Sequence, residues 1–235
     1  MIQVENLTKA YQGVEVLNIN EMSIPKGQSF GLVGNNGAGK TTFFSLLLDL
    51  IQPTTGYIQS NGVRIDRSEE WKPFTSAFID ESFLIGYLTP EEYFFFIGKL
   101  RGQSNTDVTQ FIAKYEVFFN DEILGKRKYL RDLSKGNQKK VGLIGALIGG
   151  PEVVILDEPF ANLDPTTQIR LKQLIKSETK DTQTTFLISS HDLTHVTEVC
   201  ERIVVLEKGQ VINDLKTSPE TLKALEKYFS EPLDD

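Results

Sequence analysis

A glycine-rich segment of the chain has the residue types and spacing that hold phosphate groups. "GNNGAGKTT" covers residues 34–42 and lies between a short apolar strand pattern and an apolar helix pattern. Glycines let such a loop bend so that its N–H groups converge on phosphate oxygens, and the N-terminus of the following helix attracts anions. Lys40 can reach the outer phosphates, and the Thr41 hydroxyl can ligate Mg²⁺. We therefore expect a nucleotide phosphate site made of Gly34, Asn35, Asn36, Gly37, Ala38, Gly39, Lys40, Thr41 and Thr42.

A pair of carboxylates follows another apolar strand pattern, "VVILDEP", at residues 153–159. Ligands of open α/β sheets bind beyond the carboxyl ends of the strands, where Asp157 and Glu158 would lie. Asp157 suits a Mg²⁺ position, and Glu158 suits a general base that polarises an attacking water. The alternative is that two acids merely end a strand, or that the glycines form a plain turn. The presence of both motifs in one chain argues against that alternative.

The elements around these residues alternate between strand and helix. Apolar strand patterns at 152–158 and 184–190 are each followed by a helical pattern, and a hairpin follows at 202–214. Such alternation predicts parallel strands that are covered on both faces. The N-terminal strand patterns are half-buried in character and lead to a hairpin at Asn61-Gly62. An α/β core is therefore expected, with a helical segment inserted into it.

The inserted segment runs from about residue 88 to 148 and reads as three helices. The first begins with Thr89 as N-cap, Pro90 at the first helical position and Glu92 closing a capping box. One apolar face is predicted, consisting of Tyr93, Phe96, Ile97 and Leu100. The phenylalanines at 94–96 could form a groove for a partner helix or simply fill the core of the segment.

Composition excludes several classes of protein. The 235 residues carry 25 Lys+Arg against 32 Asp+Glu, a net charge of −7, which does not fit a nucleic-acid-binding surface. One cysteine cannot form an internal disulfide and suits a reducing compartment. The start of the chain lacks the pattern of a secretory signal, and no run approaches 18 apolar residues. We expect a protein that does not span a membrane by itself.

The chain resembles the ATP-binding cassette family over nearly its whole length. "LSKGNQKKV" at 133–141 is similar to that family's signature, LSGGQQQRV, with Ser134 and Gly136 matching and with Lys135 and Asn137 as departures. "ANLDP" resembles the D-loop through Asp164, and "SSHDL" resembles the switch segment through His191. Tyr11 matches the aromatic residue that stacks on adenine. Alone, His191 would read as a structural histidine and Tyr11 as a core aromatic on a strand.

The resemblance implies a fold and a site. The fold would be a P-loop NTPase core of class α/β with a mixed parallel sheet, an N-terminal antiparallel β subdomain and an inserted helical lobe. Its core and β subdomain would cover residues 1–80 and 150–235, and the lobe about 81–149. Two copies would form a head-to-tail dimer in which Ser134, Gly136 and Asp164 of one copy face the ATP on the other. Catalysis would rest on Glu158, His191 and Lys40, with Mg²⁺ near Thr41, Asp157 and Asp80.

Asp80 is the main departure from the family pattern. Members usually carry glutamine where the core passes into the lobe, and a carboxylate adds charge and cannot donate as an amide does. A shift of the alignment by one residue would place Glu81 at this position instead.

The expected function is that of the ATP-hydrolysing subunit of a membrane transporter, with an exporter favoured by the resemblance through "LTPEEYFFF" and "LSKG". Its partners would be a second copy of itself and a multi-span permease, on the cytoplasmic face of the membrane. The alternative is a soluble cassette ATPase, for example one that assembles a cofactor. A P-loop kinase would explain the phosphate motif but leaves the signature, the D-loop and His191 unexplained.

Overall fold

The computed structural model describes residues 1–230 of the chain. Within this range the strands form one sheet in the order β5-β4-β1-β2-β10-β9-β3-β8-β7-β6. Their bounds are β1 Ile2–Tyr11, β2 Val14–Ile24, β3 Ser29–Val33, β4 Thr55–Ser60, β5 Val63–Arg64, β6 Thr75–Phe78, β7 Val153–Leu156, β8 Thr185–Ser190, β9 Arg202–Glu207 and β10 Gln210–Lys216. The α-helices are α1 Lys40–Leu47, α2 Pro90–Leu100, α3 Asn105–Lys114, α4 Lys135–Gly145, α5 Pro165–Thr182, α6 Leu193–Val199 and α7 Thr221–Ser230. Short 3₁₀ turns include η3 Glu81–Phe83 and η4 Glu116–Phe119.

The central strands are parallel and buried on both faces, as the alternating pattern predicted. β3 pairs with β8 and β9, and β7 pairs with β6 and β8, all in parallel register. Along β7, Val154 and Leu156 join the hydrophobic cluster that includes α5, α6 and the helices beyond β6, while Val153 and Ile155 join the cluster around α1. Helices therefore cover both faces of the sheet, and the carboxyl ends of β3, β7 and β8 are brought to one edge.

The N-terminal strands are antiparallel and extend the same sheet on its other side. β1 pairs antiparallel with β2 and β4, and β10 joins β2 to the core through the pair Gln210–Asn18. The predicted hairpin at 61–62 is present, because Asn61 and Gly62 have φ of 50° and 80°, as a type I′ turn requires. This arrangement brings the end of β1 next to the phosphate loop.

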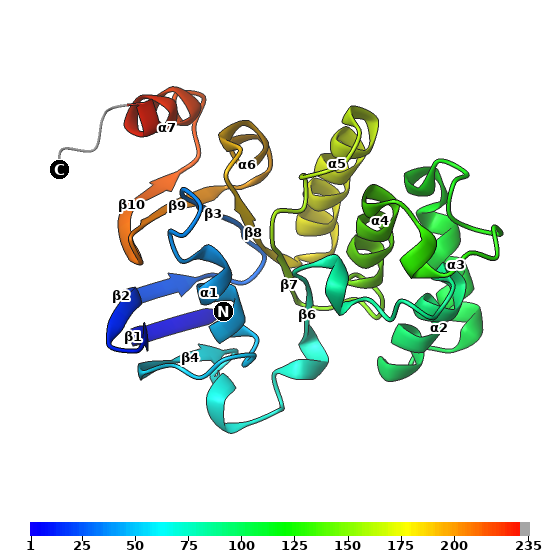
Figure 1. Ribbon diagram of the computed structural model, residues 1–235, viewed down its shortest axis with the longest axis horizontal. Coiled ribbons are helices and arrows are strands. Elements are labelled where there is room, and N and C mark those ends of the chain that lie inside the picture. The colour runs from blue at the N-terminus through cyan, green and yellow to red at the C-terminus, as the bar shows by residue number, and fades with distance from the viewer. Residues whose placement is uncertain (231–235) are drawn as a thin grey trace.

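The inserted helices α2, α3 and α4 gather at one end of the molecule, beyond β6 and β7 and opposite the N-terminal strands (Figure 1). The predicted capping box is present, since Thr89 accepts from the Glu92 N–H and Glu92 accepts from the Thr89 N–H. The predicted apolar face of α2 is only partly right. Phe94 is fully buried, whereas Phe96 is 42% exposed and Leu100 is also exposed.

The close packing of α2 against α3 explains why Phe94 is buried and Phe96 is exposed. A Cβ at position 98 would lie 2.2 Å from a methyl of Val108, so that a glycine there allows the two helices to pack closely. Phe94, one turn before Gly98, then points into the core. Phe95 packs partly against the same cluster. The phenylalanine run is therefore mainly core, with Phe96 at the surface.

The fold class is confirmed as mixed α/β, with parallel central strands, an antiparallel N-terminal part and inserted helices. Within residues 1–230, no helix combines the length and the hydropathy that a membrane span needs. The division into a core of 1–80 and 150–235 and a lobe of about 81–149 stays our proposal.

Candidate functional site

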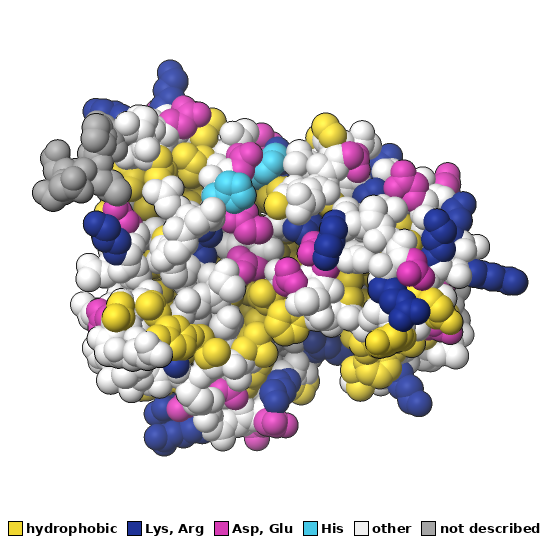
Figure 2. Space-filling model, viewed as in Figure 1, with side chains coloured by type: hydrophobic (Ala, Val, Ile, Leu, Met, Phe, Trp, Pro, Cys, Tyr) yellow, Lys and Arg dark blue, Asp and Glu magenta, His cyan; other side chains and the backbone are white. Residues whose placement is uncertain are grey.

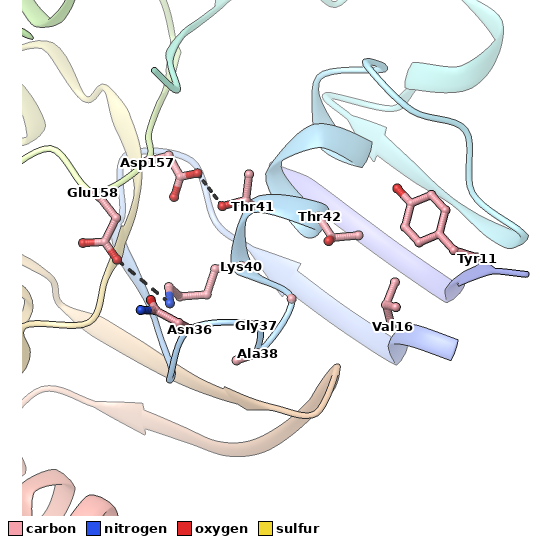
Figure 3. A pocket seen from close by; sticks show the side chains of 11 residues that line it. Tyr11, Val16, Asn36, Gly37, Ala38, Lys40, Thr41, Thr42, Asp157 and Glu158 are labelled. Atoms are coloured by element: carbon pink, nitrogen blue, oxygen red, sulfur yellow. Dashed lines mark hydrogen bonds and ion pairs between the residues drawn. The ribbon is translucent and has the colours of Figure 1, made fainter. Parts of the chain in front are cut away.

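A cavity of about 300 Å³ opens over the glycine-rich loop between β3 and α1 (Figure 3). The side chain of Tyr11 lies at one end of it, and those of Asp157 and Glu158 lie at the other. The lining residues are Tyr11, Val16, Asn36, Gly37, Ala38, Gly39, Lys40, Thr41, Thr42, Asp157 and Glu158. All of these except Val16 belong to the predicted site. Gly34 and Asn35 also belong to the predicted loop but do not line the cavity. Their backbone carbonyl oxygens accept hydrogen bonds from Lys40 nearby.

Lys40 lies at the first position of α1 with its ammonium group inside the loop. Its Nζ donates to the carbonyl oxygen of Gly34 at 2.7 Å and to that of Asn35 at 3.3 Å. The ammonium lies 3.9 Å from Glu158. Gly39 precedes it with φ of 106°, a backbone conformation that favours glycine, and begins the helix without a side-chain cap. The first N–H groups of α1 and a buried cation therefore face the cavity, which suits an anion.

Thr41 and Asp157 join the loop to the end of β7. The Thr41 hydroxyl donates to Asp157 Oδ2 at 2.7 Å (Figure 3), and the other carboxylate oxygen of Asp157 accepts from the Ser189 hydroxyl on β8. These are hard oxygen donors, the type that Mg²⁺ prefers. A magnesium ion that is also bound by nucleotide phosphates needs only one or two protein ligands, so the pair fits Mg²⁺.

His191 does not line the cavity itself but contacts Glu158, which does. His191 Nδ1 lies 2.9 Å from Glu158 Oε2, although 33 positions separate the two residues in the chain. In the space-filling view, histidine side chains lie beside acidic side chains near the middle of the face shown (Figure 2). Glu158 has φ of 46°, in the left-handed region, and its N–H donates to the Ser189 hydroxyl at 2.9 Å. Its carboxylate is thus held at the phosphate end of the cavity, where it can act on a water molecule.

Tyr11 closes the opposite end of the cavity. It is the last residue of β1, its side chain is 49% exposed, and Lys9 Nζ lies 4.7 Å from its ring centroid. A core aromatic would be buried, so the structure excludes that alternative for Tyr11. An exposed ring beside a phosphate loop can stack on a flat base.

Ser134 and Gly136 lie outside this cavity, at the start of α4. Ser134 is the N-cap of α4 and accepts from the Asn137 N–H at 3.2 Å. A Cβ at position 136 would lie 2.9 Å from the carbonyl oxygen of Asn162, so the signature turn packs closely on the D-loop of its own chain. Neither residue is among those that line the cavity within the described part of the chain. The N-terminus of α4 is therefore available to an anion from elsewhere.

Asp164 caps α5 rather than facing the cavity of its own chain. It accepts from the Thr167 N–H at 2.9 Å and from the Thr167 hydroxyl at 2.6 Å, and these bonds lower the pKa of its carboxyl. Lys140 of α4 lies 3.6 Å away. The signature helix and the D-loop thus form one surface of the chain.

Asp80 and Glu81, the two candidates for the position after β6, have different surroundings. Asp80 is the N-cap of η3 and accepts from the Ser82 N–H at 2.7 Å, and hydrogen bonds from Ser82 lower the pKa of its carboxyl. Glu81 is nearly buried, and its Oε1 lies 3.6 Å from Lys139 Nζ. Asp80 lies two residues beyond the end of β6, and the last residue of that strand is joined to the end of β7, because the Asp157 N–H donates to the Phe78 carbonyl.

Two polar residues of the site were not predicted from the sequence. Ser189 bonds both Asp157 and the Glu158 N–H, and Lys139 bonds the Glu158 carbonyl oxygen at 3.0 Å. Ser189 could have been found from its place, since it lies near the end of a strand that pairs with the one before Asp157. No pattern in the sequence singles out Lys139, which lies within a run of polar and basic residues.

Comparisons with known proteins agree with this geometry. The family model described as ABC transporter matches residues 17–161. An uncharacterized ABC transporter ATP-binding protein of Methanocaldococcus jannaschii is 34% identical over 90% of this chain and 76% of its own length. The bacitracin transport ATP-binding protein of Enterococcus faecalis is 31% identical (93% and 70% covered), and the linearmycin resistance ATP-binding protein of Bacillus subtilis is 30% identical (90% and 68%).

Among solved structures, a dimeric ATP-binding cassette in a post-hydrolysis state, bound to ADP and Pi, superposes with a TM-score of 0.82 at 22% identity. The match covers 93% of this chain and 99% of that one. At this identity the likeness shows the shared fold.

Proposed function

The chain belongs to the ABC transporter family as an ATP-binding subunit that hydrolyses ATP, and on that premise we propose that it powers an exporter as one half of an ATP-bound homodimer. The observation that carries this proposal is the division of the site. The cavity holds the phosphate loop and the carboxylates, while the signature helix begins outside it. Export is supported by the resistance protein among the relatives.

Within one chain, the residues of the cavity divide the work on ATP. The Tyr11 ring stacks on the adenine, and the Lys40 ammonium and the N–H groups of the loop bind the phosphates. Thr41 and Asp157 would hold Mg²⁺, and Asp80, which caps η3 outside the lining of the cavity, is the third residue that we propose for the metal site. Bound there, Mg²⁺ supplies positive charge that offsets the charge on the phosphate oxygens.

Glu158 accepts a proton from the water that attacks the terminal phosphate, and His191 keeps the carboxylate in place through their 2.9 Å contact. His191 is 60% exposed at its side chain, so it can also reach a phosphate oxygen. A second copy completes the site, because its Ser134 hydroxyl, its Gly136 N–H and the N-terminus of its α4 meet the same phosphates. Asp164 lies on the same surface as that signature.

The permease would dock in a groove of about 400 Å³ between η3 and the start of α4. Leu84, Leu130 and Leu133 line this groove together with charged and polar side chains. Tyr87, which follows the lining residue Gly86 in the chain, is 74% exposed. The Arg131 guanidinium lies 4.8 Å from the Tyr87 ring and 5.4 Å from the Tyr129 ring, which holds both rings at the surface. Exposed aromatic and arginine side chains are typical anchors of protein interfaces. We prefer this groove to one formed by the phenylalanines at 94–96, because Phe94 is fully buried and Phe95 packs partly against the same core.

The test uses the membrane protein encoded in the neighbouring reading frame. The chain is co-expressed with it, both are reconstituted into liposomes, and ATP hydrolysis is compared with that of the chain alone. The proposal predicts co-purification and a changed ATPase rate, both weakened by Tyr87→Ala. A soluble ATPase would hydrolyse ATP at the same rate with and without the membrane protein and would not co-purify with it.

A further inference from the structure

Lys139 is a buried cation that no part of the proposed mechanism uses. It lies on α4, five residues after Ser134, and its side chain is 7% exposed. Its Nζ donates to the backbone carbonyl oxygen of Glu158 at 3.0 Å and lies 3.6 Å from Glu81 Oε1. A lysine is rarely buried unless it is paired and hydrogen-bonded. Here the partners are the backbone of Glu158, which lines the cavity, and the carboxylate of Glu81 in the connector after β6.

The backbone at Glu158 needs support from its neighbours. Its φ of 46° lies in the left-handed region, which costs free energy for a residue with a side chain. The Glu158 N–H donates to the Ser189 hydroxyl, and the Glu158 carbonyl accepts from Lys139. Hydrogen bonds on both sides therefore fix the backbone from which the carboxylate projects toward His191 and Lys40.

Glu81 connects this arrangement to the segment between β6 and the inserted helices. Its side chain is nearly buried, and within residues 1–230 its Oε1 has no hydrogen-bond partner. A buried carboxylate without a hydrogen bond requires a nearby cation, which Lys139 supplies. The Lys139 ammonium thus contacts the connector after β6 and the carbonyl of Glu158, while its own backbone belongs to the signature helix.

We propose that Lys139 is a positioning residue for hydrolysis, which fixes the Glu158 backbone and ties it to Glu81 and to the signature helix. The proposal rests on the proposed role of Glu158 as general base. Lys139 itself does not touch ATP. Its loss should therefore change the rate of the chemical step more than the binding of ATP, because a small displacement of a general base can lower the rate by about 10²-fold.

The experiment measures kcat, KM for ATP and the melting temperature of four variants. Lys139→Met should lower kcat by about 10- to 100-fold and change KM by less than about twofold. Lys139→Arg keeps a cation and should retain most of kcat. Lys139→Met/Glu81→Gln removes both charges, so it should regain melting temperature without regaining kcat. The matched control is Lys172→Met, which breaks the 2.9 Å ion pair with Glu198 between α5 and α6 and should leave kcat unchanged.

Single-turnover hydrolysis in a Glu158→Gln background separates this proposal from the role of Glu158. If Lys139 acts through Glu158, then Lys139→Met should lower the residual rate no further. Two results would overturn the role of Lys139 while leaving that of Glu158 intact. One is that Lys139→Met lowers the hydrolysis rate by the same factor in the wild-type and the Glu158→Gln backgrounds. The other is that Lys139→Met/Glu81→Gln has the melting temperature and the kcat of the wild type. A Glu158→Gln protein that turns over at the wild-type rate would overturn the role of Glu158 and, with it, that of Lys139.

Discussion

The hydroxyl of Thr41 donates a 2.7 Å hydrogen bond to the carboxylate of Asp157, although 116 positions separate the two residues in the chain. The contact exists because the parallel register of β3, β8 and β7 places the phosphate loop and the end of β7 at one edge of the sheet. Two oxygen donors, one from the first turn of α1 and one from the residue after β7, are thereby held together before any ligand binds. Such preorganisation is what a magnesium–nucleotide complex requires of a protein.

Replacing Thr41 with valine keeps the shape of the side chain and removes its hydroxyl. We expect Thr41→Val to raise the Mg²⁺ concentration that gives half-maximal ATP turnover by about 10- to 100-fold, as the loss of a supporting ligand does in other metal sites. The measurement is the ATPase rate against free Mg²⁺, with Thr109→Val on the surface of α3 as control. Superimposable curves for wild type and Thr41→Val would remove Thr41 from the metal site.

In the proposed site Lys40 contacts the phosphates in the ground state, so its removal should weaken ATP binding itself. A hydrogen bond to a charged group contributes about 1.5–3 kcal/mol, which corresponds to about 10- to 100-fold in affinity. We therefore expect Lys40→Ala to raise the Kd for ATP by that factor in titration calorimetry. Lys26→Ala, which removes an exposed lysine paired with Glu152 outside the cavity, is the control. An unchanged Kd for Lys40→Ala would contradict the assignment.

The proposed division of the site between two chains predicts complementation. Lys40→Ala inactivates the phosphate loop, and Ser134→Arg inactivates the signature, so each protein alone should be inactive. When they are mixed, one site of the heterodimer pairs an intact loop with an intact signature, and part of the ATPase activity should return. A mixture that contains heterodimers, shown by differently tagged chains, and yet stays inactive would argue against a shared site.

Asp80 and Glu81 can now be separated by experiment. Asp80→Gln restores the amide that family members usually carry and removes one negative charge, so ATP affinity should stay nearly unchanged while the Mg²⁺ dependence of hydrolysis shifts. Asp80→Ala should impair hydrolysis more severely. The same Mg²⁺ titration is made for Glu81→Gln. If the Mg²⁺ dependence shifts only for Glu81→Gln, then Glu81 rather than Asp80 occupies the position where family members carry glutamine. If it shifts for neither residue, the segment only connects the core to the inserted helices.

The sequence predicted the central elements well, because local patterns determine them. The glycine spacing before Lys40, the apolar run before Asp157 and the capping box at Thr89 each reflect chemistry that acts over a few residues. The buried face of α2 was harder to predict. Its orientation depends on a close contact between Gly98 and Val108 of another helix, and a hydrophobic pattern alone does not contain that contact.

The residues that the sequence missed act through contacts between distant segments. Lys139 lies in "GNQKKV", where it looks like a solvated lysine, yet α4 packs so that its ammonium is buried against Glu158 and Glu81. Ser189 lies near the end of an apolar strand pattern, which hints at a place in the site, but its hydrogen bonds to Asp157 and Glu158 depend on the pairing of β8 with β7. Burial and pairing of this kind follow from the tertiary structure.

Our central proposal is that Glu158 activates water in a cavity that a second chain completes. The variant Glu158→Gln tests this proposal most directly. The substitution keeps the shape and removes the base, so ATP binding should persist while turnover falls by about 10²- to 10⁴-fold. The measurement combines single-turnover ATP hydrolysis with light scattering of the same protein with and without Mg²⁺-ATP. Our account predicts a slow enzyme that becomes a stable dimer in the presence of ATP. Hydrolysis near the wild-type rate, or a protein that stays monomeric with ATP bound, would contradict it.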